Sequence, residues 1–299
     1  MPSTLDIRRR IRSVKNTAQI TKAMQMVAAA KMRRAQSAAL AGHPYSQVLT
    51  KVLSSLRPRV DPRSHDLLQV REVRRELIVL FSTDKGLCGA LNSNLFRELL
   101  NVDSQASSYV AVGRKGVQFL ARTRRQLVAE FQIGDPPQFR EVRVIGRFCM
   151  DRFSSREVDQ VRVLYPRFVN TLTQQPVLRT LLPIPAEGLG KDGQTPAPAA
   201  SAPATATAAA APTEYPYDFE PNEGAVLSAI LPHYVNFQLF QLALDTRASE
   251  HSARMVAMKN ATDNAKQLVK DLTLEYNKAR QANITTELLE IVTAQLAVQ

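Results

Sequence analysis

Residues 233–299 read HYVNFQLFQLALDTRASEHSARMVAMKNATDNAKQLVKDLTLEYNKARQANITTELLEIVTAQLAVQ. The stretch contains neither glycine nor proline, although the whole chain carries 11 and 17 of them. Helices end or kink at these two residue types, so the stretch predicts one very long helix. At 1.5 Å per residue it would reach on the order of 100 Å, far beyond an ordinary globular helix. Such a helix needs a partner along its side.

The predicted partner is the amino-terminal stretch 3–41, which also lacks glycine and proline. Its small and apolar residues alternate four and three positions apart, as in a coiled-coil seam. They are Ile7, Ile11, Val14, Ala18, Thr21, Gln25, Ala28, Met32, Ala35 and Ala39. The second stretch repeats this spacing at His251, Met255, Met258, Thr262, Ala265, Val269, Leu272, Tyr276, Ala279 and Asn283. The two chain ends therefore predict an antiparallel coiled coil.

Local signals mark the ends of both helices. Ser3 to Asp6 resembles a capping box, and Gly42-His43-Pro44 predicts that the first helix stops there. A short helical turn is expected at 225–231, and the long helix is expected to start near Pro232. Beyond the seam, apolar residues spread around the second helix at Ile284, Leu288, Leu289, Ile291, Val292 and Leu296. A helix that is apolar on all sides is buried by something else, which predicts a partner around this end.

Residues 74–185 predict a small α/β domain between the helices. Leu77 to Phe81 is a continuous apolar run, as expected for a strand buried on both faces. Further strands are expected at 109–113, 127–131, 158–165 and 175–184, and helices at 93–100, 115–125 and 138–155. Strands that alternate with helices indicate a mainly parallel, Rossmann-like sheet. The expected fold class is α/β plus a long antiparallel coiled coil of the chain ends.

Residues 186–213 differ from the rest of the chain because alanine, proline and threonine dominate them. Such a composition cannot bury a core, so we expect a disordered or extended insertion without a mechanical role. The predicted domain boundaries are thus 1–56 for the first helix, 74–185 for the α/β domain, 186–213 for the insertion and 222–299 for the second helix.

Positive charge is concentrated near the amino terminus. Of the net charge of +12, residues 1–40 account for nine Lys or Arg against one acid, whereas residues 233–299 hold seven of each sign. A basic helix fits nucleic acid, anionic lipid or an acidic protein surface. No apolar run approaches 18 residues, and the two cysteines and four scattered histidines match no metal-site spacing. We therefore expect no membrane span, metal or cofactor.

The stretch Asp84 to Asn92 has the most suggestive local chemistry. Its Gly-Leu-Cys-Gly follows a strand and precedes a helix, as a phosphate-binding loop does. It lacks both the Walker Gly-Lys-Ser/Thr and the three-glycine dinucleotide pattern, which disfavours nucleotide binding. Cys88 beside Lys85 allows a reactive thiol, although a small packed residue is the simpler interpretation.

Four blocks of the sequence carry a family resemblance. They are IRSVKNTAQITKAMQMVAAAK at 11–31, DKGLCGALN at 84–92, SEHSARMVAMKNATDNA at 249–265, and LEYNKARQA at 274–282 followed by Ile284-Thr285. In this order they closely resemble the gamma subunits of rotary F-type ATP synthases. The blocks cover both chain ends and the loop of the α/β domain.

The resemblance implies a mechanical function. The coiled coil would pass through a ring of three alpha and three beta subunits, and the α/β domain would join the epsilon subunit and the membrane ring of c subunits. Rotation of the c ring would turn this central stalk and force the beta sites through their conformations. The chain itself would hold no catalytic residue. It would be peripheral on the cytoplasmic face of a bacterial inner membrane, with a trimmed organelle protein as the alternative origin.

The resemblance also assigns residues. Lys22, Met24, Arg280 and Gln281 would contact the beta subunit, and Ile284, Leu288, Ile291, Val292 and Leu296 would form a tip in an apolar sleeve. Tyr215, Tyr217, Asp218, Phe219 and Glu220 would face epsilon or the c ring. Asp84, Lys85, Gly86, Cys88, Gly89 and Asn92 would form the loop of the α/β domain.

Two other function classes stay open at this point. A basic coiled-coil nucleic-acid binder explains the first helix, but neither its neutral partner helix nor the apolar tip, and the strands lack RNA-binding aromatics. A Rossmann-type enzyme with helical arms is disfavoured by the absent glycine fingerprint.

Overall fold

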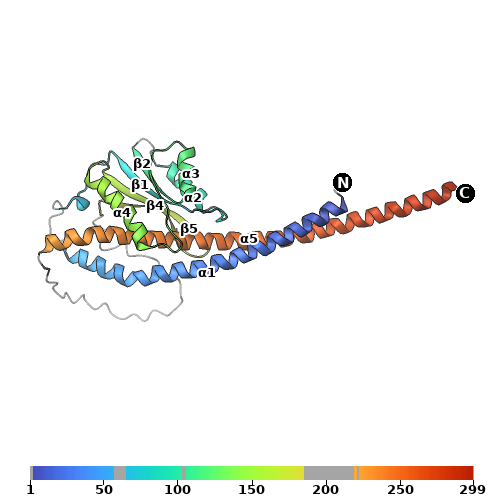
Figure 1. Cartoon of the computed structure of the whole chain (residues 1–299), viewed down its shortest axis with the longest axis horizontal. Coiled ribbons are helices and arrows are strands. Elements are labelled where there is room, and N and C mark those ends of the chain that lie inside the picture. The colour runs from blue at the N-terminus through green and yellow to red at the C-terminus, as the bar shows by residue number, and fades with distance from the viewer. Residues whose placement is uncertain (1–2, 57–64, 103–105, 185–218, 221, 299) are drawn as a thin grey trace. The chain divides into compact units, whose positions relative to one another are not determined.

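The computed structural model of the chain describes residues 3–56, 65–102, 106–184, 219–220 and 222–298. The chain divides into two compact units, Met1–Ala30 with Arg254–Gln299 (unit 1) and Lys31–Ala253 (unit 2). Helices α1 (Thr4–Leu56) and α5 (Glu223–Val298) each contribute residues to both units (Figure 1). The predicted insertion at 186–213 lies outside the described residues, and the predicted domain boundaries stay predictions.

Helix α1 begins as predicted but does not stop where expected. The backbone N–H of Asp6 donates to Ser3 Oγ over 3.2 Å, which caps the first turn. The helix then continues through Gly42 and Pro44, so the predicted stop at Gly42-His43-Pro44 is wrong. At Gly42, a Cβ atom would lie 2.0 Å from Nε2 of Gln241. This glycine allows α5 to approach closely and does not end the helix.

Packing after Pro44 offsets the penalty of a proline inside a helix, which is about 3 kcal/mol. The Tyr45 ring meets the edge of Phe237 with centroids 4.8 Å apart, and its hydroxyl lies 2.6 Å from Nε2 of His233. The next two turns place Leu49 and Leu53 in the main buried core. Each buried leucine contributes about 1.5–3 kcal/mol, which is enough to carry the helix past the proline.

Helix α5 is likewise longer than predicted. It begins at Glu223 and includes Pro232 in its interior, so the predicted start near Pro232 is wrong. Oδ1 of Asn222 accepts the backbone N–H of Ala225 over 2.7 Å and caps the helix. Leu231 and Val235 on either side of the proline are fully buried, and this burial holds the helix together across the missing hydrogen bond.

The α/β part of unit 2 is a five-stranded sheet in the order β3-β2-β1-β4-β5. Its strands are β1 (Glu76–Phe81), β2 (Ser107–Val112), β3 (Leu127–Phe131), β4 (Gln160–Phe168) and β5 (Gln174–Leu182). The first four run parallel, and β5 adds antiparallel to β4. The helices are α2 (Leu91–Leu100), α3 (Arg114–Arg122) and α4 (Phe139–Ser154), with a 3-10 turn, η3, at Asp66–Leu68. The predicted mainly parallel α/β fold is confirmed.

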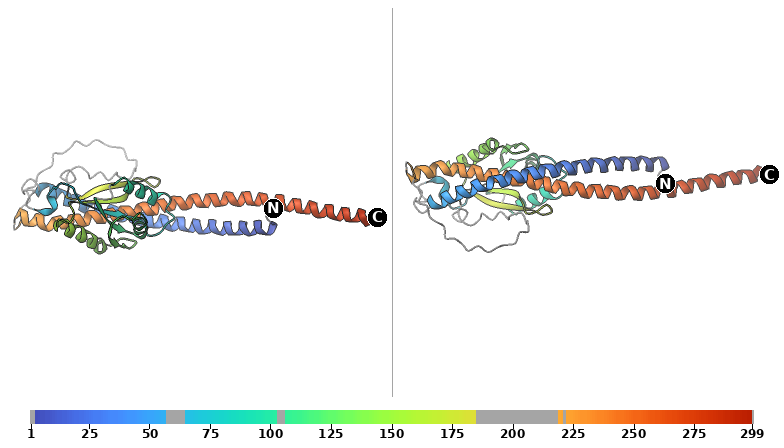
Figure 2. Two further views of the ribbon diagram at one scale, coloured as in Figure 1. Left: turned by 90° about the horizontal axis from the view of Figure 1, so that it is seen from above. Right: turned by 90° about the horizontal axis from the view of Figure 1, so that it is seen from below.

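The central strand β1 is buried on both faces, and its alternating residues enter two separate cores. Ile78 and Leu80 pack with residues of α2 and α3, whereas Leu77, Val79 and Phe81 belong to the core shared with α4, α1 and α5. The views in Figures 1 and 2 show α2 and α3 on one side of the sheet and α4 on the other. The sequence of β1 is therefore a continuous apolar run because helices cover both faces of the sheet.

Gly113 allows the turn between β2 and α3. Its φ of +98° is one that L side chains rarely adopt, and a Cβ atom there would lie 2.4 Å from the carbonyl oxygen of Ser82. That oxygen belongs to the backbone and cannot move aside without displacing the end of β1. The position therefore requires glycine.

We expect Gly113→Ala to lower the free energy of unfolding by about 2–4 kcal/mol, because strained backbone and steric overlap act together. Urea unfolding of the purified chain measures the change. The matched control is Gly86→Ala, since nothing lies within 4 Å of an added Cβ there. An equal loss in both variants would show that the close approach at Gly113 does not limit stability.

Candidate functional site

The first candidate surface is the paired helical part of unit 1. The hydroxyls of Thr21 and Thr262 lie 2.7 Å apart, and Thr262 Oγ1 also donates to the carbonyl oxygen of Met258 over 2.8 Å. All predicted seam positions of α1 are buried or half-buried, as are those of α5 as far as Ala279. The small residues of the seam thus let the two helices approach closely, and the predicted pairing is confirmed.

The register of this pair defines where the second helix loses its partner. The helices run antiparallel from the Thr21–Thr262 contact, so Thr4 at the start of α1 lies opposite Ala279. Helix α5 continues to Val298, and every residue from Arg280 to Thr293 is exposed. The 19 residues after Ala279 correspond to about 28 Å of helix.

Apolar side chains occupy one side of this projecting end, the tip. Their exposed fractions are 46% for Ile284, 58% for Leu288, 59% for Leu289, 57% for Ile291 and 51% for Val292. At 100° per residue they cover an arc of about 160°. Exposure of these apolar side chains to water is unfavourable, so the arc indicates a surface that another protein covers. The side chain of Leu296, predicted for the same tip, lies outside the described residues.

The four residues assigned to the beta subunit fall at two separate places. Arg280 and Gln281 are exposed just beyond the point where α1 begins. Lys22 is exposed and Met24 half-buried near the Thr21–Thr262 contact, about 30 Å away along the helix. Beside Met24, Ile20 is 60% exposed and Val27 is 56% exposed. Ile20 and Val27 are therefore apolar side chains that the described residues of unit 1 leave largely exposed.

The second candidate surface is the loop at the carboxyl end of β1 in unit 2. Asn92 Nδ2 donates to Thr83 Oγ1 over 2.7 Å and to Cys88 Sγ over 3.4 Å. Cys88 is 2% exposed. The loop is therefore held together from inside, and Cys88 is a packed residue rather than an accessible thiol.

The carboxylate of Asp84 in this loop is bound by an arginine of α5. Arg247 Nη2 donates to Asp84 Oδ2 over 3.1 Å and to the carbonyl oxygen of Ile133 over 2.5 Å, while Nη1 donates to Glu250 Oε2 over 2.7 Å. Burial lowers the pKa of Arg247, but the two carboxylates outweigh burial and raise it. A carboxylate at this edge, already paired, disfavours phosphate binding by the loop. No local pattern in the sequence pointed to this arginine.

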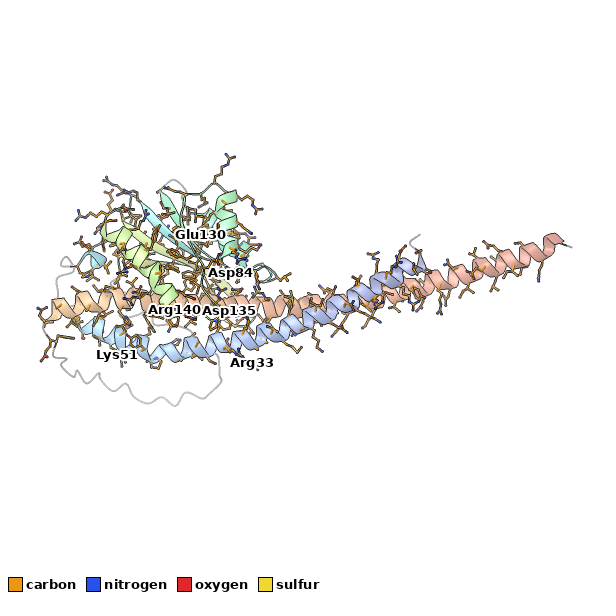
Figure 3. All side chains as sticks on the ribbon, viewed as in Figure 1. Arg33, Lys51, Asp84, Glu130, Asp135 and Arg140 are labelled. Carbon is orange, nitrogen blue, oxygen red and sulfur yellow. The ribbon has the colours of Figure 1, made fainter. Side chains whose placement is uncertain are left out.

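A second ionic contact ties α1 to the same region of unit 2. Asp135, which Figure 3 labels together with Asp84, accepts from Lys31 Nζ over 2.7 Å and lies 3.2 Å from His251 Nε2. Burial raises the pKa of Asp135, but the hydrogen bonds to Lys31 and His251 lower it by more. Through Arg247 and Asp135, the α/β domain is fixed to both long helices.

The residues predicted to face epsilon or the c ring are only partly described. Tyr215, Tyr217 and Asp218 lie outside the described residues. Phe219 is half-buried against the main core, and Glu220 is exposed.

Within the described ranges, no group of three or more His, Cys, Asp or Glu side chains could hold a metal ion. In that same part of the chain, no helix is long and apolar enough to cross a membrane.

Comparison with known proteins decides the family. The family described as ATP synthase matches residues 3–298. An ATP synthase gamma chain of Opitutus terrae is 51% identical over 297 residues, which cover 99% of both chains. The chain belongs to the ATP synthase gamma chain family. It is accordingly a central stalk subunit of an F-type ATP synthase, and this subunit is non-catalytic.

Further relatives agree with this assignment. An ATP synthase gamma chain of Akkermansia muciniphila is 44% identical over the full length of both chains. The rotor of the Euglena gracilis mitochondrial ATP synthase is similar in fold, with a TM-score of 0.65 and 19% identity, over 94% of this chain and 98% of that one. The central stalk and c-ring structure from Tetrahymena thermophila matches with a TM-score of 0.57 and 25% identity, over 81% and 99%.

A half-buried acid on α5 makes the stability of this gamma chain depend on pH. Burial raises the pKa of Asp245 to about 6, although Arg167 opposes the shift. Because the folded-state pKa exceeds the unfolded one, the ionised carboxylate lowers stability above pH 6, and this penalty disappears as pH falls toward 4.

We expect Asp245→Asn to raise the free energy of unfolding at pH 8, by up to about 3 kcal/mol for a shift of about two pKa units. The difference from the unmodified chain should fall by about half at pH 5 and to well under 1 kcal/mol near pH 4. Urea unfolding at these pH values measures it. The control Asp151→Asn removes an exposed acid. A pH-independent difference for Asp245→Asn would contradict the shifted pKa.

Proposed function

We propose that this chain transmits the rotation of a membrane c ring to a hexamer of three alpha and three beta subunits. The observation that carries the proposal is the tip, where α5 extends beyond its partner helix and exposes an apolar arc. An arc of this size requires a surrounding protein surface, and an axle end enclosed by a ring of subunits provides one. Ile284, Leu288, Ile291, Val292 and Leu296 are proposed to lie in that apolar sleeve.

The contacts to beta are proposed at two levels of the paired helices. Lys22 and Met24 would contact the mobile part of beta that moves during catalysis, and the exposed Ile20 and Val27 extend that surface. Arg280 and Gln281 would hydrogen-bond a loop of beta above it. With contacts at two levels, rotation of the asymmetric helix pair would push on each beta subunit in turn.

The α/β domain and the segment before α5 are proposed to meet epsilon and the c ring. Residues 215–220 precede α5, and the loop of Asp84, Lys85, Gly86, Cys88, Gly89 and Asn92 shapes the α/β domain. The ionic contacts of Arg247 and Asp135 support this proposal, because a stalk that transmits torque must not slip between its foot and its helices. We further propose a peripheral location on the cytoplasmic face of a bacterial inner membrane, in agreement with the bacterial relatives.

Reconstitution with alpha and beta subunits tests the proposal. We expect a stable complex whose ATPase activity depends on this chain. A chain truncated after Asn283 should still assemble, because the paired region up to Ala279 is intact, but it should deliver less torque in single-molecule rotation. If the chain stays monomeric beside alpha and beta and retards DNA instead, the basic-helix alternative replaces the stalk.

A matched pair of full-length variants isolates the apolar arc. Ile284→Ser, Leu288→Ser and Ile291→Ser together should lower the torque as the truncation does. The triple control Thr286→Ser, Glu287→Gln and Glu290→Gln changes the opposite side of the same turns and should leave torque unchanged. Equal effects in both triples would mean that the tip acts without an apolar sleeve.

The proposed hydrogen bonds to beta can be tested separately. Arg280→Ala should weaken the affinity of the chain for the alpha–beta hexamer by roughly 10- to 150-fold, since a hydrogen bond from a charged group is worth about 1.5–3 kcal/mol. Lys278→Ala removes a nearby exposed charge and serves as the control. Affinity measured by titration of labelled chain should separate the two variants, and identical affinities would remove Arg280 from the interface.

A further inference from the structure

A group of arginines surrounds a shallow depression at the amino-terminal edge of the sheet, remote from the contacts described above. The depression holds about 540 Å³ and is lined by Arg71, Glu72, Arg74, Arg75, Arg156 and Asp159, among others. We call it the arginine depression. Four positive charges face two negative ones, so the local field favours an anion.

The two acids of the arginine depression are weak competitors for such an anion. The Asp159 carboxylate accepts the backbone N–H groups of Arg74 and Arg75 over 3.1 and 2.9 Å, so it caps the start of β1. Glu72 pairs with Arg74 over 2.9 Å, but both side chains are 78% exposed. An exposed pair of this kind is worth at most about 1 kcal/mol, and Arg74 can readily turn to another acceptor.

The arginines differ in what they offer to a ligand. Arg71 is structural, because Nη1 donates to the carbonyl oxygen of Phe153 over 3.1 Å and the guanidinium lies 4.8 Å from the centre of that ring. Arg75 is exposed and donates through Nη2 to the carbonyl oxygen of Arg156. Arg74 and Arg156 are also exposed, and they project from two different segments. Arg74, Arg75 and Arg156 therefore form the accessible positive rim.

Apolar side chains interleave with these arginines. Val70 is 86% exposed and Val73 is 51% exposed, and they alternate in sequence with Arg71 and Arg74. A free phosphate ion gains nothing from exposed valines. A phospholipid surface does, because its headgroups take the charges while the apolar side chains enter the boundary of the acyl region.

The position of the depression agrees with such a surface. Leu67, just before this segment, belongs to the same buried core as Leu56 at the end of α1 and Leu227 near the start of α5. The views in Figures 1 and 2 place η3 at that end of unit 2. Under the proposed function, on which this step rests, the α/β domain lies on the membrane side of the complex, so its amino-terminal edge can reach lipid headgroups.

We propose that the arginine depression, with Val70 and Val73, contacts the headgroups of anionic phospholipids. A fluid lipid surface suits a rotating subunit, because headgroups diffuse and do not hold the stalk at one angle. A site on a protein that does not rotate with the stalk would oppose rotation at each turn.

The test uses the complex with alpha and beta subunits, in which the basic part of α1 is enclosed. Its partitioning onto vesicles of phosphatidylglycerol and phosphatidylcholine is measured by co-sedimentation and compared with vesicles of phosphatidylcholine alone. Arg74→Gln with Arg156→Gln should reduce partitioning by roughly 30-fold, at about 1 kcal/mol for each arginine near an anionic surface. Val70→Ser with Val73→Ser should reduce it further.

The matched control is Arg140→Gln with Arg143→Gln, which removes the same charge from the exposed face of α4. Arg140, labelled in Figure 3, lies near the start of α4, about 21 Å along the helix from its last residue, Ser154, which precedes Arg156. This pair should change partitioning less than threefold. Equal losses in both pairs would overturn the proposal in favour of a net-charge effect. If inorganic phosphate at matched ionic strength displaced the complex from the vesicles, and the valine changes did not alter its partitioning, the depression would instead be a free-phosphate site.

The outcome separates this inference from the proposed function. If the complex assembles and turns but shows no preference for anionic vesicles, the lipid contact is overturned and the stalk function stands. If the chain does not assemble, vesicle partitioning of the two double-arginine variants is compared in the isolated full-length chain. Neither variant changes α1, so the Arg74→Gln, Arg156→Gln variant should again lose more partitioning than the control.

Discussion

The close approach of α1 and α5 is the constraint on which the rest of the structure depends. At Thr21 and Thr262 the two hydroxyls meet at 2.7 Å, and at Gly42 even one added carbon would reach the side chain of Gln241. Small residues at these points remove the bulk that would keep the helices apart. Because the contact is close in each unit, helical segments that would be unstable alone are stabilised by a partner along their side.

The ionic contacts of unit 2 explain how a separate α/β domain can act as one body with the helices. Arg247 bridges α5, the loop after β1 and the chain before α4, and Asp135 joins Lys31 of α1 to His251 of α5. The charge of Arg247 is buried and multiply bonded, so the loss of one of its partners would be strongly destabilising and this joint resists partial opening. The Lys31–Asp135 pair is more exposed and contributes less. That stiffness is what torque transmission requires of a foot.

The same residues occupy the edge at which a Rossmann-like sheet would bind a nucleotide. In open α/β sheets, ligands bind at the carboxyl ends of the strands. In this chain, that edge holds Asp84, whose carboxylate already accepts from Arg247, and Cys88 packs beneath the loop. The fold therefore supplies a rigid support, and the function lies in the surfaces of the helices. The family relationship assigns that function at the level of the central stalk.

The sequence by itself determined the helix pairing, the alternation of strands and helices, and the exposed apolar tip, because periodicity and the absence of glycine and proline act locally. It also identified the family through blocks at both chain ends. Only the tertiary structure decided that α1 passes Pro44 and that α5 passes Pro232, since burial of residues such as Leu53 and Leu231 outweighs a local break. Likewise, the partners of Arg247 lie 114 and 163 residues away, and no local pattern records such distant contacts.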